Sequence, residues 1–342
     1  MSVGFVNQPQ GVSLDALIIP AKQIKAGVHV VIDEAKAIPA FQALGAQVIY
    51  RQSRDDHAHE RYDAAGFVAD LHAQAPVGAL LHLGNEPGRN NLGALDSWSL
   101  AAMQACDRVG RKGVIFNFET GNPEPGDWPA LAASVKYAYE YGHIIGLHEY
   151  FDVTVARSLK WHVGRFKFLL DTFGAKTPRI IITELGCAVG YNPYAGWQTV
   201  HTAESYAPEI GVAMDVYRPY GIDALVYLLG YWDRTATFDC RGQQPIFDEM
   251  ERVNQLGEGN EMVVPGYVQA KTKPANATVN LRGGPSLKHA PIGFVRTGDW
   301  VKRLPGSTIS ADGYTWQLIA VDKTADSHLH GWCALEVIWV GD

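Results

Sequence analysis

Residues 113–147 read GVIFNFETGNPEPGDWPALAASVKYAYEYGHIIGL, and this stretch contains the pattern that decides the fold. It opens and closes with short apolar runs, Gly113–Phe118 and His143–Leu147. Each run is too short for a typical helix and is rich in Ile, Leu or Phe, as expected of a strand buried on both faces. Between them Trp128–Tyr141 has helical spacing, and Gly142 follows where a left-handed C-cap would fall. The stretch predicts a strand–helix–strand unit of a parallel sheet.

The same alternation extends in both directions along the chain. Further strands are expected at Val28–Ile32, Gln47–Tyr50, Ala79–Leu83, Arg179–Thr183 and Ala224–Leu229. The helices expected between them are Glu34–Leu44, Ala64–Ala73, Ser97–Val109, Val155–Phe173 and Glu204–Tyr220. An eighth strand must come from residues 1–20, either Val3–Val6 or Leu17–Ile19. Eight such units predict a (β/α)₈ TIM barrel, which usually takes about 250 residues. A doubly wound open sheet is the alternative, but no Gly-x-Gly-x-x-Gly turn follows an early strand.

The character of the sequence changes near residues 256–275. The segment Val264–Asn276 is rich in Lys, Pro, Ala and Thr, which is typical of a linker or an extended lead-in. Short β-type runs follow at Ala277–Leu281, Ile292–Val295, Trp300–Arg303, Thr315–Val321 and Trp332–Val340. We therefore expect a barrel domain in residues 1–258, a linker in 259–274 and a small all-β barrel in 275–342.

Charge and hydrophobicity indicate which kinds of partner the protein can bind. Residues 274–342 carry six basic and six acidic side chains, so the whole net charge of −7 lies in residues 1–273. The negative charge of residues 1–273 argues against binding to a nucleic acid, which is itself negatively charged. It suits a neutral or cationic substrate. We expect no membrane partner, because no apolar run is long enough to cross a bilayer.

The N-terminus and the cysteines bear on the cellular compartment. The opening residues MSVGFVNQPQ lack a basic region and a long apolar core, so they are not a secretory signal. Either the protein is cytoplasmic, or a signal has been removed, or it leaves the cell by another route such as phage lysis; we expect it outside the cell or released by phage. The four cysteines (Cys106, Cys187, Cys240 and Cys333) form no Cys-x-x-Cys pair, so we expect no structural zinc site and no metal or other cofactor. Cys187 and Cys240 both follow expected strand ends, which leaves open either a rim disulfide or the commoner plain buried thiols.

Two carboxylates are expected at the ends of apolar strands. Glu86 comes after the run that ends at Leu83, and Glu184 comes after the run that begins at Arg179. In a barrel of this type the carboxyl ends of the strands form the active-site face. A protonated carboxyl could donate to a glycosidic oxygen while an ionised one attacks the anomeric carbon, with retention if the two are roughly 5–5.5 Å apart. The structural alternative is a pair of carboxylates that cap helices or bind arginine.

These motifs resemble clan A glycoside hydrolases of the family 5 type. Asn85-Glu86-Pro87 and Ile182-Thr183-Glu184 are similar to the motifs that follow strands 4 and 7 in that clan. The resemblance covers residues 28–250 and implies that Glu86 is the acid/base and Glu184 the nucleophile. It further implies a retaining enzyme that cleaves β-glycosidic bonds in a poly- or oligosaccharide by double displacement. The negative charge of Glu184 is then expected to raise the pKa of Glu86.

The resemblance also suggests residues that would bind the carbohydrate. His148-Glu149-Tyr150 is similar to the His-x-Tyr element after strand 6, so Tyr150 would hold the Glu184 carboxylate with His148 beside it. Asn85 would form a hydrogen bond with the 2-hydroxyl group of the sugar. Arg51 would hold the nucleophile in place, and Trp232 would form the floor of the sugar-binding subsite. Glu119 and Glu149 are two further carboxylates at strand ends, and each either contacts substrate or forms a salt bridge.

The C-terminal stretch resembles bacterial SH3 domains. Val279–Ser286 is similar to their opening motif, and Pro291–Gly293, Gly298–Val301 and Gly331-Trp332 follow in the expected order. The resemblance implies an SH3-like module that binds a cell-wall or polysaccharide ligand or packs on the enzyme. Two alternatives to a plain glycosidase stay open: a phage-type or secreted cell-wall lytic glycosidase targeted by this module, and a non-catalytic carbohydrate-binding barrel. A binding protein, however, has no need of a paired acid and nucleophile.

Overall fold

The computed structural model describes residues 1–8, 12–53, 56–159, 161–192, 194–230, 235–257, 267–269, 271–272, 278–282, 286–295, 300–322, 328–334 and 338–339. The chain forms two compact units, Met1–Gly259 and Asn260–Asp342. The expected linker, residues 259–274, lies mostly outside the described residues, and the expected domain limits stay predictions. Among the helices that the structure describes, none is long and apolar enough to cross a membrane.

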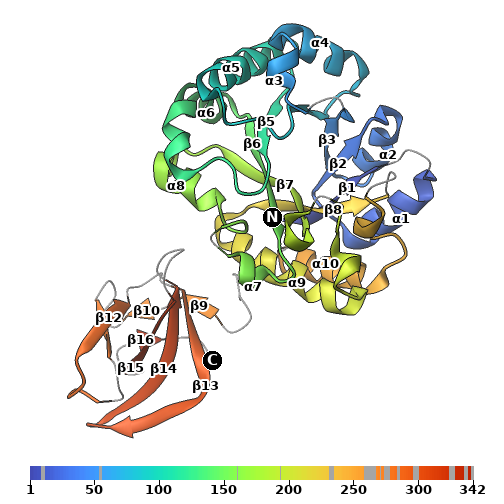
Figure 1. Ribbon diagram of the computed structural model, residues 1–342. Helices are drawn as coiled ribbons and strands as arrows, with labels where there is room; N and C mark the ends of the chain where they lie inside the picture. The colour runs from blue at the N-terminus through green and yellow to red at the C-terminus, as the bar shows by residue number, and fades with distance from the viewer. Residues whose placement is uncertain are drawn as a thin grey trace. The chain divides into compact units, whose positions relative to one another are not determined.

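The first unit is a closed barrel of eight parallel strands in sequence order (Figure 1). The strands are β1 (Val3–Asn7), β2 (Val28–Ile32), β3 (Gln47–Arg51), β4 (Leu80–Leu83), β5 (Gly113–Phe118), β6 (Ile144–Phe151), β7 (Arg179–Cys187) and β8 (Asp223–Leu229). Pairing of Val3 with Ala224 joins β1 to β8 and closes the ring. The predicted barrel is confirmed, the open sheet is excluded, and the first of the two candidate segments supplies the eighth strand.

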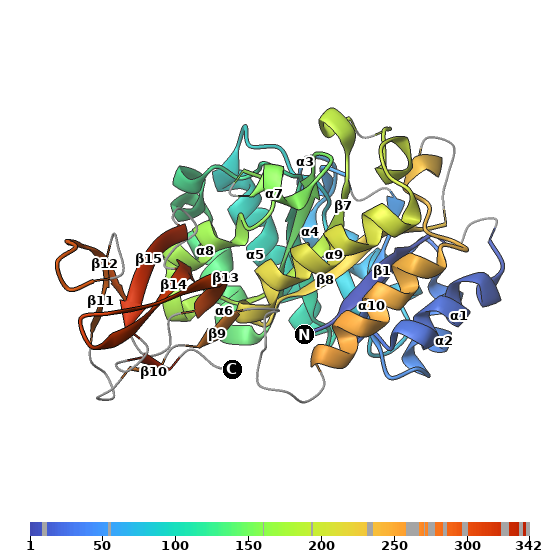
Figure 2. The same ribbon diagram turned by 90° about the horizontal axis from the view of Figure 1, so that it is seen from below.

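Helices surround the strands (Figures 1 and 2). They are α1 (Leu14–Ile24), α2 (Ile38–Gln42), α3 (Ala58–Arg61), α4 (Ala64–Gln74), α5 (Leu92–Arg108), α6 (Ala132–Tyr141), α7 (Val155–Ser158), α8 (Phe166–Phe173), α9 (Ala203–Tyr217) and α10 (Gln244–Gly257). The expectation of one helix over Val155–Phe173 was wrong, because a loop separates α7 from α8. Gly164 in that loop has φ +89°, a left-handed conformation that a continuous helix cannot include.

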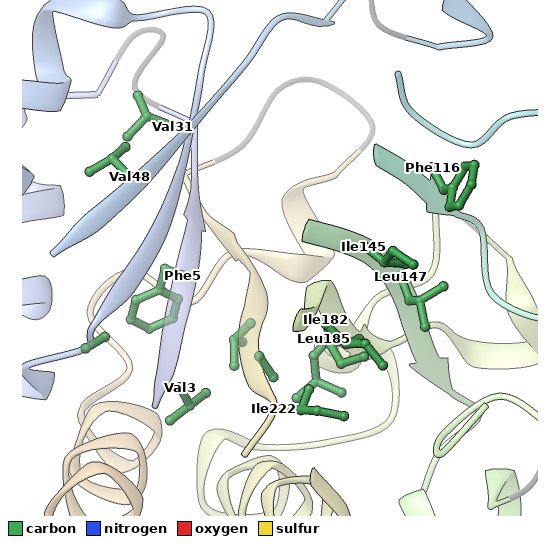
Figure 3. Packing of buried hydrophobic residues seen from close by; sticks show 14 of the residues in the cluster. Val3, Phe5, Val31, Val48, Phe116, Ile145, Leu147, Ile182, Leu185 and Ile222 are labelled. Carbon is green, nitrogen blue, oxygen red and sulfur yellow. The ribbon is translucent and has the colours of Figure 1, made fainter. Parts of the chain in front are cut away.

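The barrel has two hydrophobic cores because alternate residues of each strand point to opposite faces. Val28, Val30 and Ile32 of β2 belong to the cluster inside the barrel, whereas Val31 belongs to the larger cluster between strands and helices. Figure 3 shows Val31 and Val48 among residues of that larger cluster. Each such fully buried aliphatic side chain contributes about 1.5–3 kcal/mol. The same alternation continues to the carboxyl ends of the strands. There, the inward-facing positions carry polar side chains, which point into the mouth of the barrel.

The second unit is built of antiparallel strands. They are β9 (Tyr267–Gln269), β10 (Lys271–Thr272), β11 (Val279–Arg282), β12 (Pro291–Val295), β13 (Trp300–Ala311), β14 (Tyr314–Asp322), β15 (His328–Ala334) and β16 (Ile338–Trp339). Six of them form one sheet in the order β12-β11-β15-β14-β13-β9, and β10 pairs with β16. Val301, Trp316 and Ile319 are buried. The described part of this unit is all-β, as the sequence predicts.

All four cysteines are buried and free, so Cys187 and Cys240 do not form a rim disulfide. The Cys240 thiol instead faces the backbone oxygen of Phe238 at 3.5 Å. Burial raises the pKa of Cys187 to about 11, so this thiol stays protonated near neutral pH. These cysteines pack as small apolar side chains.

Candidate active site

The two candidate catalytic carboxylates lie at the carboxyl end of the barrel, on β7 and just beyond β4. Glu86 follows the last residue of β4 by three positions, and Glu184 lies in β7 opposite His148 of β6. The pairing of β7 with β8 shifts register between Ile182 and Leu185, and Glu184 falls within that irregular segment. The Glu184 side chain is 7% exposed and the Glu86 side chain is 40% exposed. One carboxylate is therefore shielded and the other is open to solvent.

His148 lies between the two carboxylates. Its Nδ1 is 3.1 Å from Oε1 of Glu86 and 3.5 Å from Oε2 of Glu184. The nearest oxygens of the two carboxylates lie within 4.8 Å of one another. Two strands that are separate in sequence thus bring their acidic side chains to a single point.

Two further groups hold Glu184, one from a buried residue and one from a half-buried residue. Arg51, at the end of β3, donates from Nη1 to Oε1 of Glu184. Tyr150 of β6 donates from its hydroxyl to Oε2 at 2.6 Å. Each oxygen therefore has a donor, and one donor carries a full positive charge. Such charge-assisted bonds fix the position of both carboxylate oxygens.

The pKa of Glu86 departs from the expectation. Burial alone would raise this pKa, but the hydrogen bond and positive charge of His148 outweigh that effect, and the charges of Arg51 and His57 act in the same direction. The net result is a pKa below the usual value. The predicted rise from the charge of Glu184 was wrong for the free protein, because the cationic and donor groups around Glu86 dominate.

Asn85 is placed beside Glu86 with one free acceptor. It is 3% exposed, and its Nδ2 donates to Oδ1 of Asp56 at 2.8 Å. Its Oδ1 has no hydrogen-bond partner among the residues that the structure describes, and neither has Nε2 of His148. Both atoms are buried and keep unused hydrogen-bonding capacity beside the carboxylates.

Two of the expected carboxylates, Glu119 and Glu149, make their contacts elsewhere. Trp232 lies outside the described residues. Glu119 is exposed on the loop after β5, where its Oε1 accepts a 2.5 Å hydrogen bond from Nδ2 of Asn122. Glu149 points to the opposite face of β6 from His148, and it is buried against the N-terminal end of α8. It accepts hydrogen bonds from the backbone N–H groups of Gly164 and Phe166 and has the Tyr217 hydroxyl 2.9 Å from Oε2.

Two residues that the sequence reasoning missed adjoin the carboxylates. His82 of β4 is buried, and burial together with the charges of Arg51 and His148 lowers its pKa. Tyr227 of β8 is 8% exposed, with its ring centroid 5.8 Å from that of Tyr150. Burial, reinforced by the charge of Glu184, raises its pKa. Both could have been found from strand periodicity, because His82 lies two residues after the inward-facing Leu80 and Tyr227 two after Leu225.

Glu86, His148 and Glu184 could also act as ligands of a cation, since each offers an atom within 4.8 Å of the others. The guanidinium of Arg51, however, already lies against Glu184. A metal ion at this place would face that positive charge at close range, which favours an acid and a nucleophile over a metal centre.

Comparisons with known proteins identify the fold. No family model matches the chain, and no curated protein sequence matches it. In structure the chain is similar to a glucosidase from Croceicoccus marinus, with a TM-score of 0.54, 10% sequence identity and coverage of 93% of this chain and 79% of that one. It is similar to an endo-β-1,4-mannanase from Thermotoga petrophila, with a TM-score of 0.51, 11% identity and coverage of 95% and 84%. It is also similar to PbGH5A, a glycoside hydrolase family 5 enzyme from Prevotella bryantii B14, with a TM-score of 0.50, 13% identity and coverage of 71% and 86%. The chain thus shares the eight-stranded parallel α/β barrel of these glycoside hydrolases.

Proposed function

We propose that this protein is a retaining glycoside hydrolase of the clan A type, with Glu86 as acid/base and Glu184 as nucleophile. The observation that carries the proposal is the approach of the two carboxylates to within 4.8 Å at the carboxyl end of the barrel. This closest approach of one oxygen from each carboxylate supports direct attack, since the carboxyl groups of a retaining pair are about 5–5.5 Å apart and those of an inverting pair about 6.5–9.5 Å apart. The proteins of similar fold are named as a glucosidase, a mannanase and a family 5 enzyme, which supports the same reaction.

The contacts suit the two half-reactions. Arg51 and Tyr150 hold the oxygens of Glu184 in place, so that Glu184 can attack the anomeric carbon as Glu86 gives its proton to the leaving oxygen. In the second half-reaction Glu86 takes a proton from water, and that water cleaves the glycosyl–Glu184 ester. The low pKa of Glu86 in the free protein requires cleavage to start from a minor protonated form or from an acidic solution.

The substrate is proposed to be a β-linked poly- or oligosaccharide. The loops after β6 and β7 carry aromatic side chains that are open to solvent: Trp161 is 70% exposed, Tyr191 44% and Tyr194 54%. The ring of His162 lies against that of Tyr191 in a tilted arrangement, with centroids 3.9 Å apart. Exposed aromatic rings suit the apolar faces of sugar rings.

The C-terminal unit is proposed to be an SH3-like module that directs the enzyme to a cell wall. The motif order across β11, β12 and β13 and the antiparallel pairing of these strands support this part of the proposal. Loss of turbidity of bacterial cell suspensions, compared between the full chain and its Glu184→Gln variant, tests it. Equal turbidity with both proteins would rule out a wall-lytic glycosidase.

The catalytic proposal is tested with a panel of 4-nitrophenyl and 2,4-dinitrophenyl β-glucosides, β-mannosides and β-glucuronides. Glu184→Gln is expected to abolish turnover. Glu86→Ala is expected to retain turnover of the dinitrophenyl glycosides, whose leaving group needs no proton, and to be rescued by azide. A fully active Glu184→Gln variant would overturn the assignment. Its inactivity also separates the enzyme from a non-catalytic binding barrel, which would lose nothing measurable in this assay.

A further inference from the structure

Strand β5 contains an irregularity next to the catalytic pair. Phe116 pairs with Gly146 and Phe118 pairs with Leu147, so Asn117 is left as an extra residue without a partner in the register of β6. Phe116 and Asn117 have φ values of +71° and +48°. This left-handed region is costly for most residues and least so for Asn among those with a side chain. A strained bulge inside a barrel strand is most often retained for the position of a functional group.

The bulge turns Asn117 toward both catalytic strand ends. Its backbone oxygen accepts the N–H of Glu86 at 3.0 Å. Its Nδ2 donates to the backbone oxygen of Gly84 at 2.8 Å. Its Oδ1 accepts the hydroxyl of Thr183 at 3.0 Å. Asn117 is 0% exposed and Thr183 1% exposed, so water does not compete for these bonds.

The neighbouring strand leaves room for this arrangement. A Cβ atom at Gly146 of β6 would lie 1.9 Å from Oδ1 of Asn117 and 3.1 Å from the Thr183 hydroxyl oxygen. Any side chain at residue 146 would therefore displace the amide. The Asn117–Thr183 contact crosses β6 through a gap that only glycine provides.

We propose that Asn117 is a positioning residue that sets the distance between the acid/base and the nucleophile, and that Thr183 is its partner on the nucleophile strand. We call its contacts with Gly84, Glu86 and Thr183 the Asn117 bridge. The bridge spans the barrel from the segment Gly84–Glu86 to the residue directly before Glu184. Because neither side chain faces solvent, both act through the catalytic glutamates. The inference rests on the proposed glycosidase function.

Thr183→Val tests the bridge with a small change of shape, because it removes the donor to Asn117 and keeps the branched side chain. A misplacement of the reacting groups on the order of 1 Å can cost 10²-fold in rate, so kcat on the fastest aryl glycoside of the panel is expected to fall about 10- to 100-fold. KM is expected to stay within about twofold, since the substrate contacts remain. Thr183→Ser keeps the hydroxyl and is expected to recover most of kcat.

Asn117→Asp is the second variant. It keeps the shape of the side chain but replaces the Nδ2 donor to the backbone oxygen of Gly84 with an oxygen that can only accept. Ser134→Ala is the matched control: Ser134 is also fully buried and donates its hydroxyl to Oδ1 of Asp96 at 2.6 Å, but it belongs to α6 outside the barrel. A loss of kcat in Thr183→Val but not in Ser134→Ala, at a similar fall in Tm, supports the bridge.

Wild-type kcat in Thr183→Val overturns the inference while leaving the proposed function intact. Equal losses in Thr183→Val and Thr183→Ser also overturn it, because the hydroxyl would then be irrelevant. A wild-type protein that hydrolyses no member of the panel or any defined oligosaccharide overturns the proposed function and the bridge together. The three results are distinguishable in one set of assays.

Discussion

The hydroxyl of Tyr150 donates a 2.6 Å hydrogen bond to Oε2 of Glu184, the oxygen on the side facing His148. The ring that carries this hydroxyl is fixed by edge-on contacts with Tyr227 and Phe238, at centroid distances of 5.8 and 6.1 Å. Burial and the charge of Glu184 raise the pKa of Tyr150, so the hydroxyl remains a donor throughout the working pH range. Tyr150 therefore fixes the orientation of the Glu184 carboxylate.

Tyr150→Phe is expected to lower kcat by about 10- to 100-fold. A hydrogen bond to a charged group contributes about 1.5–3 kcal/mol, which corresponds to this range of rates. Tyr137→Phe is the control, because Tyr137 donates to Asp107 at 2.8 Å on the outer helix α6. Steady-state kinetics on the same aryl glycoside would contradict the account if both variants kept the wild-type kcat, or if both lost it equally.

His148→Ala is expected to move the alkaline limb of the kcat/KM profile to higher pH. In the proposed mechanism the first half-reaction needs protonated Glu86, so kcat/KM should fall as the pH rises through the pKa of this group. His148 lowers that pKa by its hydrogen bond and charge, against the effect of burial. Removal of His148 should therefore raise the pKa. His143→Ala is the control: it removes a buried histidine 3.2 Å from Asp107 and should leave the alkaline limb in place. If the alkaline limb does not move in His148→Ala, the assignment of Glu86 as the acid/base is contradicted.

Glu149 is expected to make stability depend on pH near neutrality. Burial, opposed by the donors from Gly164, Phe166 and Tyr217, raises the pKa of Glu149 from 4.5 to about 7. The folded protein thus keeps a proton that the unfolded chain releases. The resulting stabilisation is fully present below the unfolded pKa and is lost as the pH rises through about 7, at most roughly 3 kcal/mol.

The measurement is the Tm at pH 5 and at pH 8 for the wild type and for Glu149→Gln. The variant cannot ionise, so its Tm should fall less between the two values of pH. Glu140→Gln changes an exposed carboxylate on α6 and should keep the wild-type slope. Equal slopes for the wild type and Glu149→Gln would mean that Glu149 is ionised in the folded protein.

Trp161→Ala is expected to affect long substrates more than short ones. Its ring is the most exposed aromatic side chain on the loops after β6 and β7, and stacking on a sugar is worth about 1 kcal/mol, or roughly fivefold in affinity. KM for hexasaccharides should rise by about that factor, with a smaller effect on aryl monosaccharides. Tyr139→Ala, an exposed aromatic change on α6, is the control. If the effect of Trp161→Ala on KM is the same for long and short substrates, the substrate does not bind against Trp161.

The barrel and the two carboxylates could be predicted because both depend on local pattern. A charged residue close after an apolar run rarely belongs to the hydrophobic core, and this is how Glu86 and Glu184 stand out in the sequence. The lengths of β6 and β7 could not be predicted in the same way. The polar residues His148 and Glu149 end the apolar run, yet the strand continues to Phe151 because parallel neighbours supply its hydrogen bonds.

Asn117 shows why the rest of the site was missed. In the sequence it is a lone polar residue inside an apolar run, and nothing local indicates a left-handed conformation there. Its conformation is set by Gly84, Glu86 and Thr183, which lie far away along the chain. The direction of the pKa shift of Glu86 was missed for a similar reason, since the position of His148 between the carboxylates arises only on closure of the barrel.

The most direct test of the account is to trap the covalent intermediate. The wild-type protein is incubated with the 2-deoxy-2-fluoro-β-glycosyl fluoride of the sugar that it hydrolyses best, and its intact mass and peptides are measured. The account predicts a mass increase of one fluoroglycosyl group, located on Glu184 and absent from Glu184→Gln. An active enzyme that gains no adduct, or carries it on another residue, would contradict the assignment of Glu184 as the nucleophile.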